Sequence, residues 1–320
     1  MLSEKKLSHL VGFSNGRMCN GDSMRLLITG AWREGEAQAE RLREMGHEVC
    51  FLRQEKDPLP CDPGWPEGIV CNGLFLHHPI EAFTSLRYLQ LTSAGMDRMD
   101  TEYLRKHHVE VHNARGVYSG PMAEFALAGV LSLYKRLPAF RLQQQSRQWI
   151  KRRDLRELTG RRVLILGCGS VGTECAKRFR AFGCTVAGID LVPREDPAFD
   201  EILPQQALDR ELPGADILVL TLPLAPETRH LIDARRLSLL RGILVNLSRG
   251  AVIDQKALET WEGEAVLDVF EEEPLLPDSP LWAKGTFLIT PHVSFIGEGN
   301  AARLTALILK NLEEVTPAVR

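Results

Sequence analysis

Short apolar runs alternate with polar and amphipathic segments along most of this chain. In the second half, six runs rich in Val, Ile and Leu are separated by helical or loop segments. Strands that are apolar on both faces and joined by crossovers are typical of a parallel sheet covered by helices on both sides. We therefore predict a doubly wound α/β domain with strands at 163–166, 185–189, 217–220, 243–247, 265–267 and 287–290.

The first half repeats this alternation on a smaller scale. An apolar run at 26–29 is followed by a helical pattern at 36–45, which Gly46 ends, and further short apolar runs come after it. We predict a small α/β unit with strands at 26–29, 49–52, 68–71, 88–91 and 109–112.

A long apolar segment separates the two halves. Residues 122–137 are apolar on nearly all sides, which is typical of a helix buried between domains or subunits. A mostly helical pattern at 300–314 follows the last strand, and we expect it to return to the first unit. The predicted organisation is a loose polar tail at 1–23, a small discontinuous unit at 24–121 and 294–320, and a large unit at 122–293.

Composition and charge argue against several classes of protein. The 320 residues suggest about two domains, and 44% apolar with 25% charged residues is ordinary for a globular chain. The net charge of −3 argues against nucleic acid as the main partner, and no apolar run reaches the roughly 18 residues that a membrane span needs. Seven cysteines without paired spacing argue against a disulfide framework or a zinc site. We therefore expect a reduced, cytoplasmic protein with no metal.

The sequence Gly-Cys-Gly-Ser-Val-Gly at 167–172 directly follows the predicted strand 163–166 and opens an amphipathic helix. Gly167 permits a tight turn, Gly169 lets the backbone approach a diphosphate, and Gly172 allows the helix to pack closely on the strand. The helix N-terminus supplies amide donors for the phosphates. A lone glycine pattern arises by chance, so it is the strand–turn–helix context that favours a dinucleotide site over a glycine-rich turn without a ligand.

Asp190 ends the next predicted strand, 18 residues beyond Gly172. A carboxylate there can accept hydrogen bonds from the hydroxyls of the adenosine ribose, and it would repel the 2′-phosphate of NADP. The position favours NAD over NADP as the cofactor, although Arg194 weakens this preference.

Polar residues lie at the carboxyl ends of several predicted strands. Asp190, Arg249, Asp268 and His292 have such positions, and the acidic run 271–273 follows Asp268 closely. Open α/β sheets bind ligands at this edge. Taken alone, the arginine, the acidic run and the histidine would each be ordinary solvated loop residues. Their joint placement predicts an Arg–Glu–His set for hydride transfer beside a nicotinamide.

Together these motifs resemble the D-isomer-specific 2-hydroxyacid dehydrogenases, NAD-dependent oxidoreductases that interconvert 2-keto acids and D-2-hydroxy acids. The resemblance implies a Rossmann NAD-binding domain at 122–293 and a smaller, discontinuous α/β substrate domain. It also implies a homodimer joined partly through the helix at 122–137. The matching segments are 93–97, 122–124, 167–172, 222–228, 246–250, 267–275 and 290–292.

The resemblance implies a role for each site residue. Arg249 would hold the carboxylate and keto oxygen of the substrate, His292 would be the general acid–base, and Glu273 would pair with His292. Asp268 would face the nicotinamide carboxamide. Amides of Ser93, Ala94 and Gly95 would cradle the substrate carboxylate, and the implied cofactor-binding residues are Gly167, Gly169, Ser170, Val171, Gly172, Asp190, Leu222, Pro223, Leu247, Ser248, Arg249, Asp268 and His292.

The chemistry of these residue types agrees with those roles. Reduction of a 2-keto acid needs a hydride at C2 and a proton on the developing alkoxide. Arg249 offers an always-charged, bidentate fork for a carboxylate. His292 must be protonated for reduction and neutral for oxidation, and a nearby Glu273 would favour its charged form. We therefore expect reduction to fall as the pH rises.

Departures from related enzymes narrow the substrate. Formate dehydrogenases resemble this layout but carry Gln in place of Glu273, and phosphite dehydrogenases carry Lys where Ala94 stands. Residues 118–137 look closest to the glyoxylate/hydroxypyruvate reductase branch, many members of which use NADP. The side chain of the substrate is left open.

Two other functions are compatible with a dinucleotide-binding sheet. A dinucleotide-sensing scaffold, similar to the corepressors of this family, would bind NADH with little turnover of keto acids. An amino-acid dehydrogenase would need ammonia for turnover, and the combination of Arg249, Glu273 and His292 argues against it.

Overall fold

The structure is a computed structural model in which residues 23–96 and 98–315 are described. The described chain divides into two compact units. The first unit comprises residues 23–90, 100–112 and 305–315, and the second comprises 91–96, 98–99 and 113–304. The tail predicted at 1–23 lies outside the described residues apart from Ser23, and the predicted domain bounds stay predictions.

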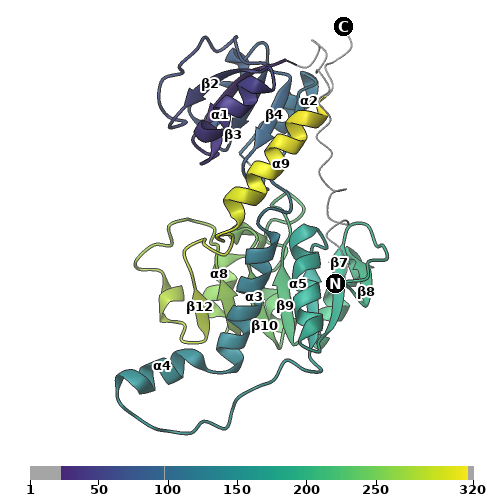
Figure 1. Cartoon of the computed structure of the whole chain (residues 1–320). Coiled ribbons are helices and arrows are strands. Elements are labelled where there is room, and N and C mark those ends of the chain that lie inside the picture. Colours follow the sequence, from purple (N-terminus) through teal and green to yellow (C-terminus); the bar gives the residue numbers. More distant parts are fainter. Residues whose placement is uncertain (1–22, 97, 316–320) are drawn as a thin grey trace, which may run out of the picture. The chain divides into compact units, whose positions relative to one another are not determined.

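The second unit is built on a seven-stranded parallel sheet (Figure 1). Its strands are β6 (Arg162–Leu166), β7 (Thr185–Asp190), β8 (Glu201–Pro204), β9 (Ile217–Leu220), β10 (Ile243–Asn246), β11 (Glu264–Leu267) and β12 (Phe287–Ile289). They are ordered β12-β11-β10-β9-β6-β7-β8, and every neighbouring pair is parallel. The chain runs outward from β6 on one side and from β9 on the other, which confirms the predicted doubly wound fold.

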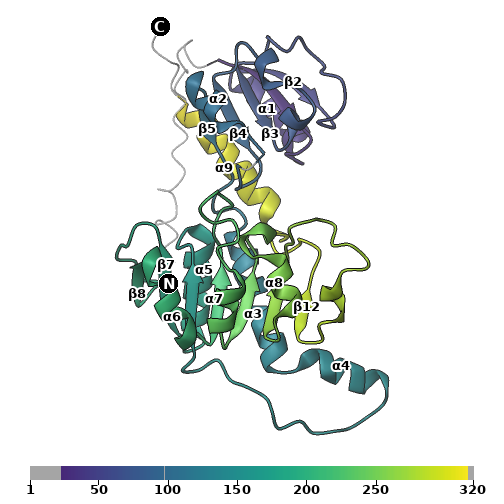
Figure 2. The same cartoon turned by 180° about the vertical axis from the view of Figure 1, so that it is seen from behind.

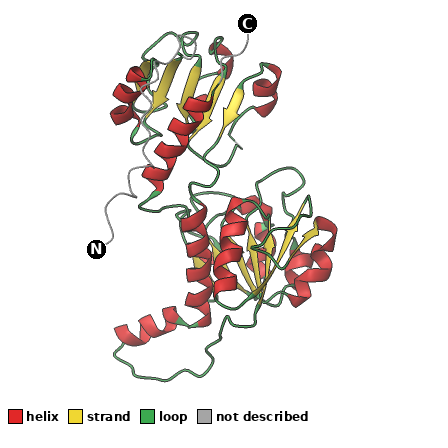
Figure 3. Ribbon diagram, turned by 45° about the vertical axis from the view of Figure 1, so that its right-hand side comes forward, coloured by secondary structure: helices red, strands yellow, loops and turns green. Residues whose placement is uncertain are grey.

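Helices cover both faces of this sheet because its strands are apolar on both sides. The helices of the unit are α3 (Ser119–Tyr134), α4 (Leu137–Gln145), α5 (Ser170–Ala181), α6 (Leu208–Glu211), α7 (Ala234–Leu239) and α8 (Gln255–Thr260). Val163 and Ile165 of β6 share one apolar core with α3 and α5, whereas Leu164 and Leu166 share a second core with α6, α7 and α8. Figures 1 and 2 show the sheet from opposite sides, and Figure 3 shows helices on both sides of its strands.

The sequence pattern misses β8 and α4. Only Ile202 of β8 is buried, because this short strand lies at the edge of the sheet, so it carries little apolar signal. In α4 none of the residues is buried, so the segment has no core-facing stripe to predict it. The helix expected at 122–137 is α3, which ends at Tyr134, because Arg136 adopts a left-handed conformation with φ 53° and caps α4, which starts at Leu137.

The first unit holds a five-stranded sheet in the order β2-β1-β3-β4-β5. Its strands are β1 (Arg25–Thr29), β2 (Glu48–Leu52), β3 (Gly68–Cys71), β4 (Tyr88–Leu91) and β5 (Glu110–His112), and its helices are α1 (Gly35–Glu44), α2 (Thr101–Lys106) and the part of α9 (Asn300–Glu314) that follows Leu304. Asn311 of α9 donates a hydrogen bond to Gln90 at 2.7 Å, and Trp32 donates one to Thr305 at 2.9 Å. These bonds attach the C-terminal helix to a unit whose strands come from the start of the chain.

Single turns of 3₁₀ helix complete the two units, at Leu74–Leu76, Ile80–Ala82, Gln205–Ala207, Leu212–Gly214, Gly250–Val252 and Pro280–Ala283. Within residues 23–96 and 98–315, every helix is too short or too polar to cross a lipid bilayer.

Candidate active site

The turn between β6 and α5 is shaped by three glycines with different surroundings. Gly167 has φ +93°, a conformation that favours glycine. A Cβ on Gly172 would lie 2.1 Å from the carbonyl oxygen of Gly167, so only glycine lets the helix approach the turn this closely. Around Gly169 no atom lies within 4 Å of the position that a Cβ would take. The turn is therefore tight on its inner side and open on its outer side.

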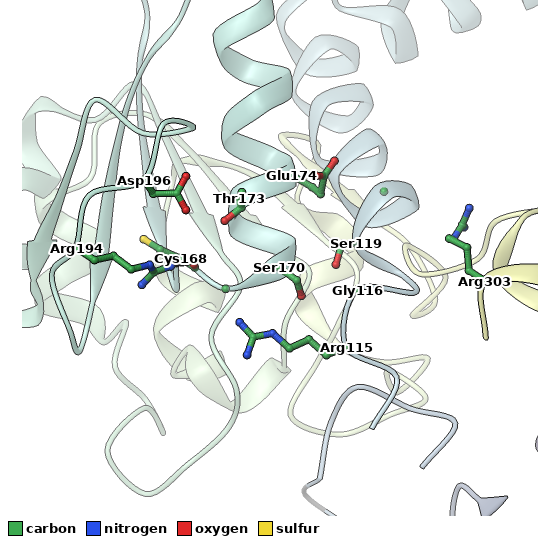
Figure 4. A pocket seen from close by; sticks show the side chains of 12 residues that line it. Arg115, Gly116, Ser119, Cys168, Ser170, Thr173, Glu174, Arg194, Asp196 and Arg303 are labelled. Carbon is green, nitrogen blue, oxygen red and sulfur yellow. Dashed lines mark hydrogen bonds between the residues drawn. The ribbon is translucent and has the colours of Figure 1, made fainter. Parts of the chain in front are cut away.

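A cavity of about 490 Å³ lies on this open side (Figure 4). The N-terminus of α5 faces it through Gly169 and Ser170, and Gly169 provides no side-chain cap for the amides of the first helical turn. Arg115 and Arg194 also line the cavity. Uncapped amides beside guanidinium groups suit the diphosphate of a dinucleotide, so these residues fit that cofactor.

Asp190 ends β7 next to the same turn. Its Oδ2 accepts a hydrogen bond from the amide of Cys168 at 2.9 Å, and its Oδ1 accepts one from the amide of Leu191 at 2.7 Å. Arg194 forms an ion pair with Asp190 at 3.4 Å and donates a hydrogen bond to the carbonyl oxygen of Cys168. The carboxylate is thus held at the glycine turn and shares its charge with one arginine.

His292 follows β12 and has a left-handed backbone with φ 52°. Its amide donates to the carbonyl oxygen of Asp268 at 2.8 Å, and its Nδ1 lies 2.7 Å from Oε2 of Glu273. The other oxygen of Glu273 accepts the amide of Phe270 at 3.0 Å. Both side chains of the pair are about one-third exposed. Because Nδ1 faces Glu273, Nε2 is the ring nitrogen left for a substrate.

Asp268 is fully buried and organises the turn that carries His292. Its carboxylate accepts hydrogen bonds from the Thr290 hydroxyl at 2.6 Å and from the amides of Val293 at 2.9 Å and Ser294 at 2.8 Å. The contact implied between Asp268 and the nicotinamide stays a prediction. In the structure this carboxylate binds the Thr290 side chain before the histidine and the backbone amides of Val293 and Ser294 after it.

Arg249 lies three residues beyond β10 in a turn organised by Asn246. The Asn246 amide group donates to the carbonyl oxygen of Arg249 at 3.0 Å and accepts from the Ser248 hydroxyl at 2.8 Å. Gly250 follows with no room for a side chain, since a Cβ there would lie 1.8 Å from the carbonyl carbon of Phe270. The turns after β10 and β11 therefore pack directly on each other.

The loop at Ser93, Ala94 and Gly95 belongs to the same unit as Arg249 and His292. The Asn113 side chain donates to the carbonyl oxygen of Ala94 at 2.9 Å, and the amide of Ala114 donates to the carbonyl oxygen of Ser93 at 2.9 Å. The loop is therefore held by the segment that precedes α3.

The predicted site residues meet at one edge of the sheet, because parallel strands present their carboxyl ends together. Asp190, Leu222, Arg249, Asp268 and His292 lie at or just beyond the ends of β7, β9, β10, β11 and β12. The glycine turn lies at the end of β6, beside β9, where the strand order reverses. This switch point is where doubly wound sheets bind dinucleotides.

The sequence motifs assign no individual role to three residues of this region, although Asn246 lies within the matching segment 246–250. Asn246 organises the Arg249 turn, Arg115 lines the cavity, and the Thr221 hydroxyl donates to the carbonyl oxygen of Gly167 at 2.6 Å. Asn246 and Thr221 carry a signal that could have been used, since each is a polar residue at the end of an apolar strand. Arg115 carries none, because it lies far from the glycine motif in the sequence.

The cysteines near the turn are poor nucleophiles. Burial, with the nearby charge of Asp190, raises the pKa of the Cys168 thiol to about 12, and burial raises that of Cys175 to about 12 as well. Their thiols stay protonated at neutral pH. Among the described residues no cluster of three or more His, Cys, Asp or Glu side chains is arranged to hold a metal ion.

Comparison with known proteins identifies the family of this chain. The model of the NAD-binding domain of D-isomer specific 2-hydroxyacid dehydrogenases matches residues 127–294, more than half of the chain. The chain belongs to this family. It is therefore an NAD-binding D-2-hydroxyacid dehydrogenase, which confirms the resemblance drawn from its motifs.

Relatives of this dehydrogenase include enzymes with named activities. A glyoxylate reductase from Korarchaeum cryptofilum is 31% identical over 244 residues, covering 72% of this chain and 74% of the relative. A family member of known structure from Aeromonas salmonicida is 32% identical and has a TM-score of 0.73. The match covers 90% of this chain and 96% of that protein. A second, from Xanthobacter autotrophicus in complex with NADPH and MES, is 28% identical with a TM-score of 0.73 and covers 92% and 97% of the two chains.

Proposed function

We propose that this dehydrogenase reduces a short 2-keto acid to the D-2-hydroxy acid, with His292 as the proton donor. The observation that carries the proposal is the 2.7 Å contact between His292 and Glu273. It lies at the sheet edge where a bound dinucleotide would place its nicotinamide. A carboxylate on Nδ1 fixes the orientation of the ring and stabilises its protonated form.

Each residue then has a distinct task. When bound, NADH supplies the hydride that is transferred to C2 of the keto acid. His292 donates its Nε2 proton to the oxygen on which negative charge develops, and Glu273 stabilises the imidazolium before that transfer. Arg249 binds the substrate carboxylate with its planar fork, and the amides of the loop 93–95 bind the same group from another side. In the oxidative direction, neutral His292 accepts the proton.

The nature of the substrate is supported by the relatives. Besides the glyoxylate reductases, an (S)-sulfolactate dehydrogenase from Chromohalobacter salexigens is 29% identical over 239 residues. Both names describe short acids that carry a carboxylate next to the reacting carbon. We therefore propose a short 2-keto acid as the substrate of this chain.

We propose NADH as the preferred cofactor because three acidic side chains, Asp190, Glu195 and Asp196, follow or end β7. They would repel a 2′-phosphate more than the single Arg194 attracts it. The related structure with NADPH supports some use of NADPH as well.

We also propose that the protein forms a homodimer. The segment from α4 to residue 155 exposes large apolar side chains, which in a single chain face water. Several exposed large apolar side chains in one segment are typical of subunit contacts. The side chains are Leu137, Leu142, Trp149, Ile150 and Leu155. A cytoplasmic location stays a prediction.

The test follows NADH absorbance with glyoxylate, hydroxypyruvate, pyruvate, 2-ketobutyrate and phenylpyruvate. We expect turnover of at least one short keto acid. His292→Ala should lower kcat by about 10²- to 10⁴-fold, the usual contribution of a general acid, while NADH still binds. Tight NADH binding without turnover of any acid would contradict the proposal and favour the scaffold alternative.

Glu273→Gln provides the matched variant, since it keeps the shape of the side chain and removes its charge. Without the carboxylate, Nδ1 of His292 loses the charged acceptor that orients the ring, so kcat should fall while KM for NADH stays nearly unchanged. The measurement is steady-state kinetics under saturating substrates. An unchanged kcat would show that Glu273 does not support His292 in proton transfer.

A further inference from the structure

Arg115 brings a positive charge to the cavity at the N-terminus of α5. Its side chain lines this cavity together with Gly169 and Ser170, and Figure 4 shows it extending from its loop toward Ser170. Among the described residues, its guanidinium has no hydrogen-bond acceptor and no carboxylate within ion-pair distance. The group is thus a bidentate donor without an intramolecular partner.

The other charged side chains that line the cavity already have partners. Arg194 is paired with Asp190, and Arg303 donates to the carbonyl oxygen of Val117 at 2.8 Å. Glu174 is paired with Arg178 and with Lys177 at 2.7 Å. Of the cavity's three arginines, Arg115 is therefore the one whose full donor set is available to a ligand.

The backbone of Arg115 is held in place although its side chain is exposed. Its amide donates to the side chain of Asn113 at 3.1 Å, and Gly116 after it turns the chain with φ +92°. Asn113 and Ala114 in turn bind the loop 93–95. The side chain therefore extends into the cavity from a backbone position that is fixed.

We propose that Arg115 is a ligand of the cofactor diphosphate, opposite the amides of the glycine turn. The inference rests on the proposed dinucleotide site and adds a residue to it. The turn supplies neutral amide donors, whereas a diphosphate carries two negative charges, and an arginine fork can bind two of its oxygens at once. Because Arg115 shares its segment with the residues that hold loop 93–95, bound cofactor would also stabilise the loop that receives the substrate carboxylate.

The test measures binding to Arg115→Ala by titration calorimetry with three ligands. ADP-ribose contains the diphosphate without the nicotinamide, NADH contains both, and adenosine contains no phosphate. We expect the affinities for NADH and ADP-ribose to fall by about 10- to 100-fold, the range for a charge-assisted hydrogen-bonded pair, and that for adenosine to stay the same. Arg115→Lys should restore part of the loss, and the loss should shrink in high salt.

Kinetics separate this role from a structural one. A diphosphate contact is equally strong before and during hydride transfer, so Arg115→Ala should raise KM for NADH and leave kcat nearly unchanged. NADPH should be weakened by the same factor as NADH. A loss confined to NADPH would instead assign Arg115 to the 2′-phosphate and overturn the proposal.

Arg241→Ala is the matched control. Arg241 is an exposed arginine of the same unit, and it lies just before β10, at the amino ends of the strands and away from the glycine turn. Its removal changes the net charge by the same amount as removal of Arg115. It should leave all three affinities unchanged. If the wild-type protein reduces keto acids and Arg115→Ala binds ADP-ribose as tightly as wild type, only the inference about Arg115 fails. If the wild-type protein binds neither NADH nor ADP-ribose, the proposed function fails with it.

Discussion

At the scale of single residues, Asp190 holds the glycine turn and, as we propose, influences the choice of cofactor. Its two oxygens accept the amides of Cys168 and Leu191, which attaches the end of β7 to the glycine turn. Oδ1 keeps a second lone pair for a ribose hydroxyl, whereas Oδ2 also accepts from Arg194 at 3.4 Å. Arg194, at 3.4 Å, offsets part of the negative charge that would repel a 2′-phosphate. We therefore propose that these two side chains contribute in opposite directions to the preference for NADH.

Substitutions of Asp190 and of Arg194 should change the preference for NADH over NADPH in opposite directions. Asp190→Ser removes the repulsion and the ribose acceptor, so the ratio of kcat/KM for NADH over NADPH should fall by about tenfold or more. Arg194→Ala removes the attraction, so the same ratio should rise. The measurement is steady-state kinetics with both cofactors, after thermal unfolding has shown that each variant is folded. A ratio that stays constant in both variants would refute the assignment of these residues.

At the scale of elements, two glycines of the β6–α5 turn differ in what a side chain would meet. Gly172 is in contact with the backbone of Gly167, whereas Gly169 faces open space. A methyl group at 172 must displace the helix from the strand beneath it. At 169 a methyl group meets no protein atom, but it occupies the side from which a diphosphate would approach.

Two alanine variants of this turn should therefore have different effects. Gly172→Ala should lower the free energy of unfolding by about 1–3 kcal/mol, as expected for overpacking at a buried contact. Gly169→Ala should leave the free energy of unfolding nearly unchanged and weaken NADH binding. Urea unfolding and NADH titration measure the two quantities, and Gly285→Ala, which also has open space around it, is the control for both. Equal loss of stability at 169 and 172 would contradict this division.

At the scale of the whole molecule, the segment from α4 to residue 155 is a part of the described chain that leaves several large apolar side chains exposed. No residue of α4 is buried, and Trp149 beyond it is 96% exposed. A tryptophan in water loses the apolar burial that usually makes this residue important in interfaces. A second copy of the chain, bound through this segment, would cover it.

The corresponding prediction concerns the mass in solution. Wild-type protein should have the mass of two 35.8 kDa chains in light scattering, because burial of these side chains drives association. The double variant Leu142→Asp, Trp149→Asp should be monomeric, since a charge cannot be buried in an apolar contact without a partner. Leu76→Asp, at a residue that is 60% exposed in the first unit, should stay dimeric. A wild-type monomer at micromolar concentration would disprove the dimer.

The sequence by itself determined the features that depend on neighbours along the chain. The period of the apolar runs predicted the parallel strands of the second unit, and the glycine spacing predicted a tight turn between β6 and α5. Knowledge that the strands are parallel was then enough to collect Asp190, Arg249, Asp268 and His292 at one edge. The strands could be predicted because a strand that is buried on both faces consists almost entirely of apolar residues.

Only the tertiary structure decided the features that depend on residues far apart in sequence. The strand β8 and the helix α4 have little buried surface of their own, so no local pattern announces them. The resemblance implied that Glu273 pairs with His292, but only the structure supplies the 2.7 Å contact between them. The hydrogen bonds of the buried Asp268 to the turn that carries His292, and the position of Arg115 at the glycine turn, likewise join separate loops. Side-chain contacts between loops are set by the packing of the elements that carry them, and an unaligned sequence contains no measure of that distance.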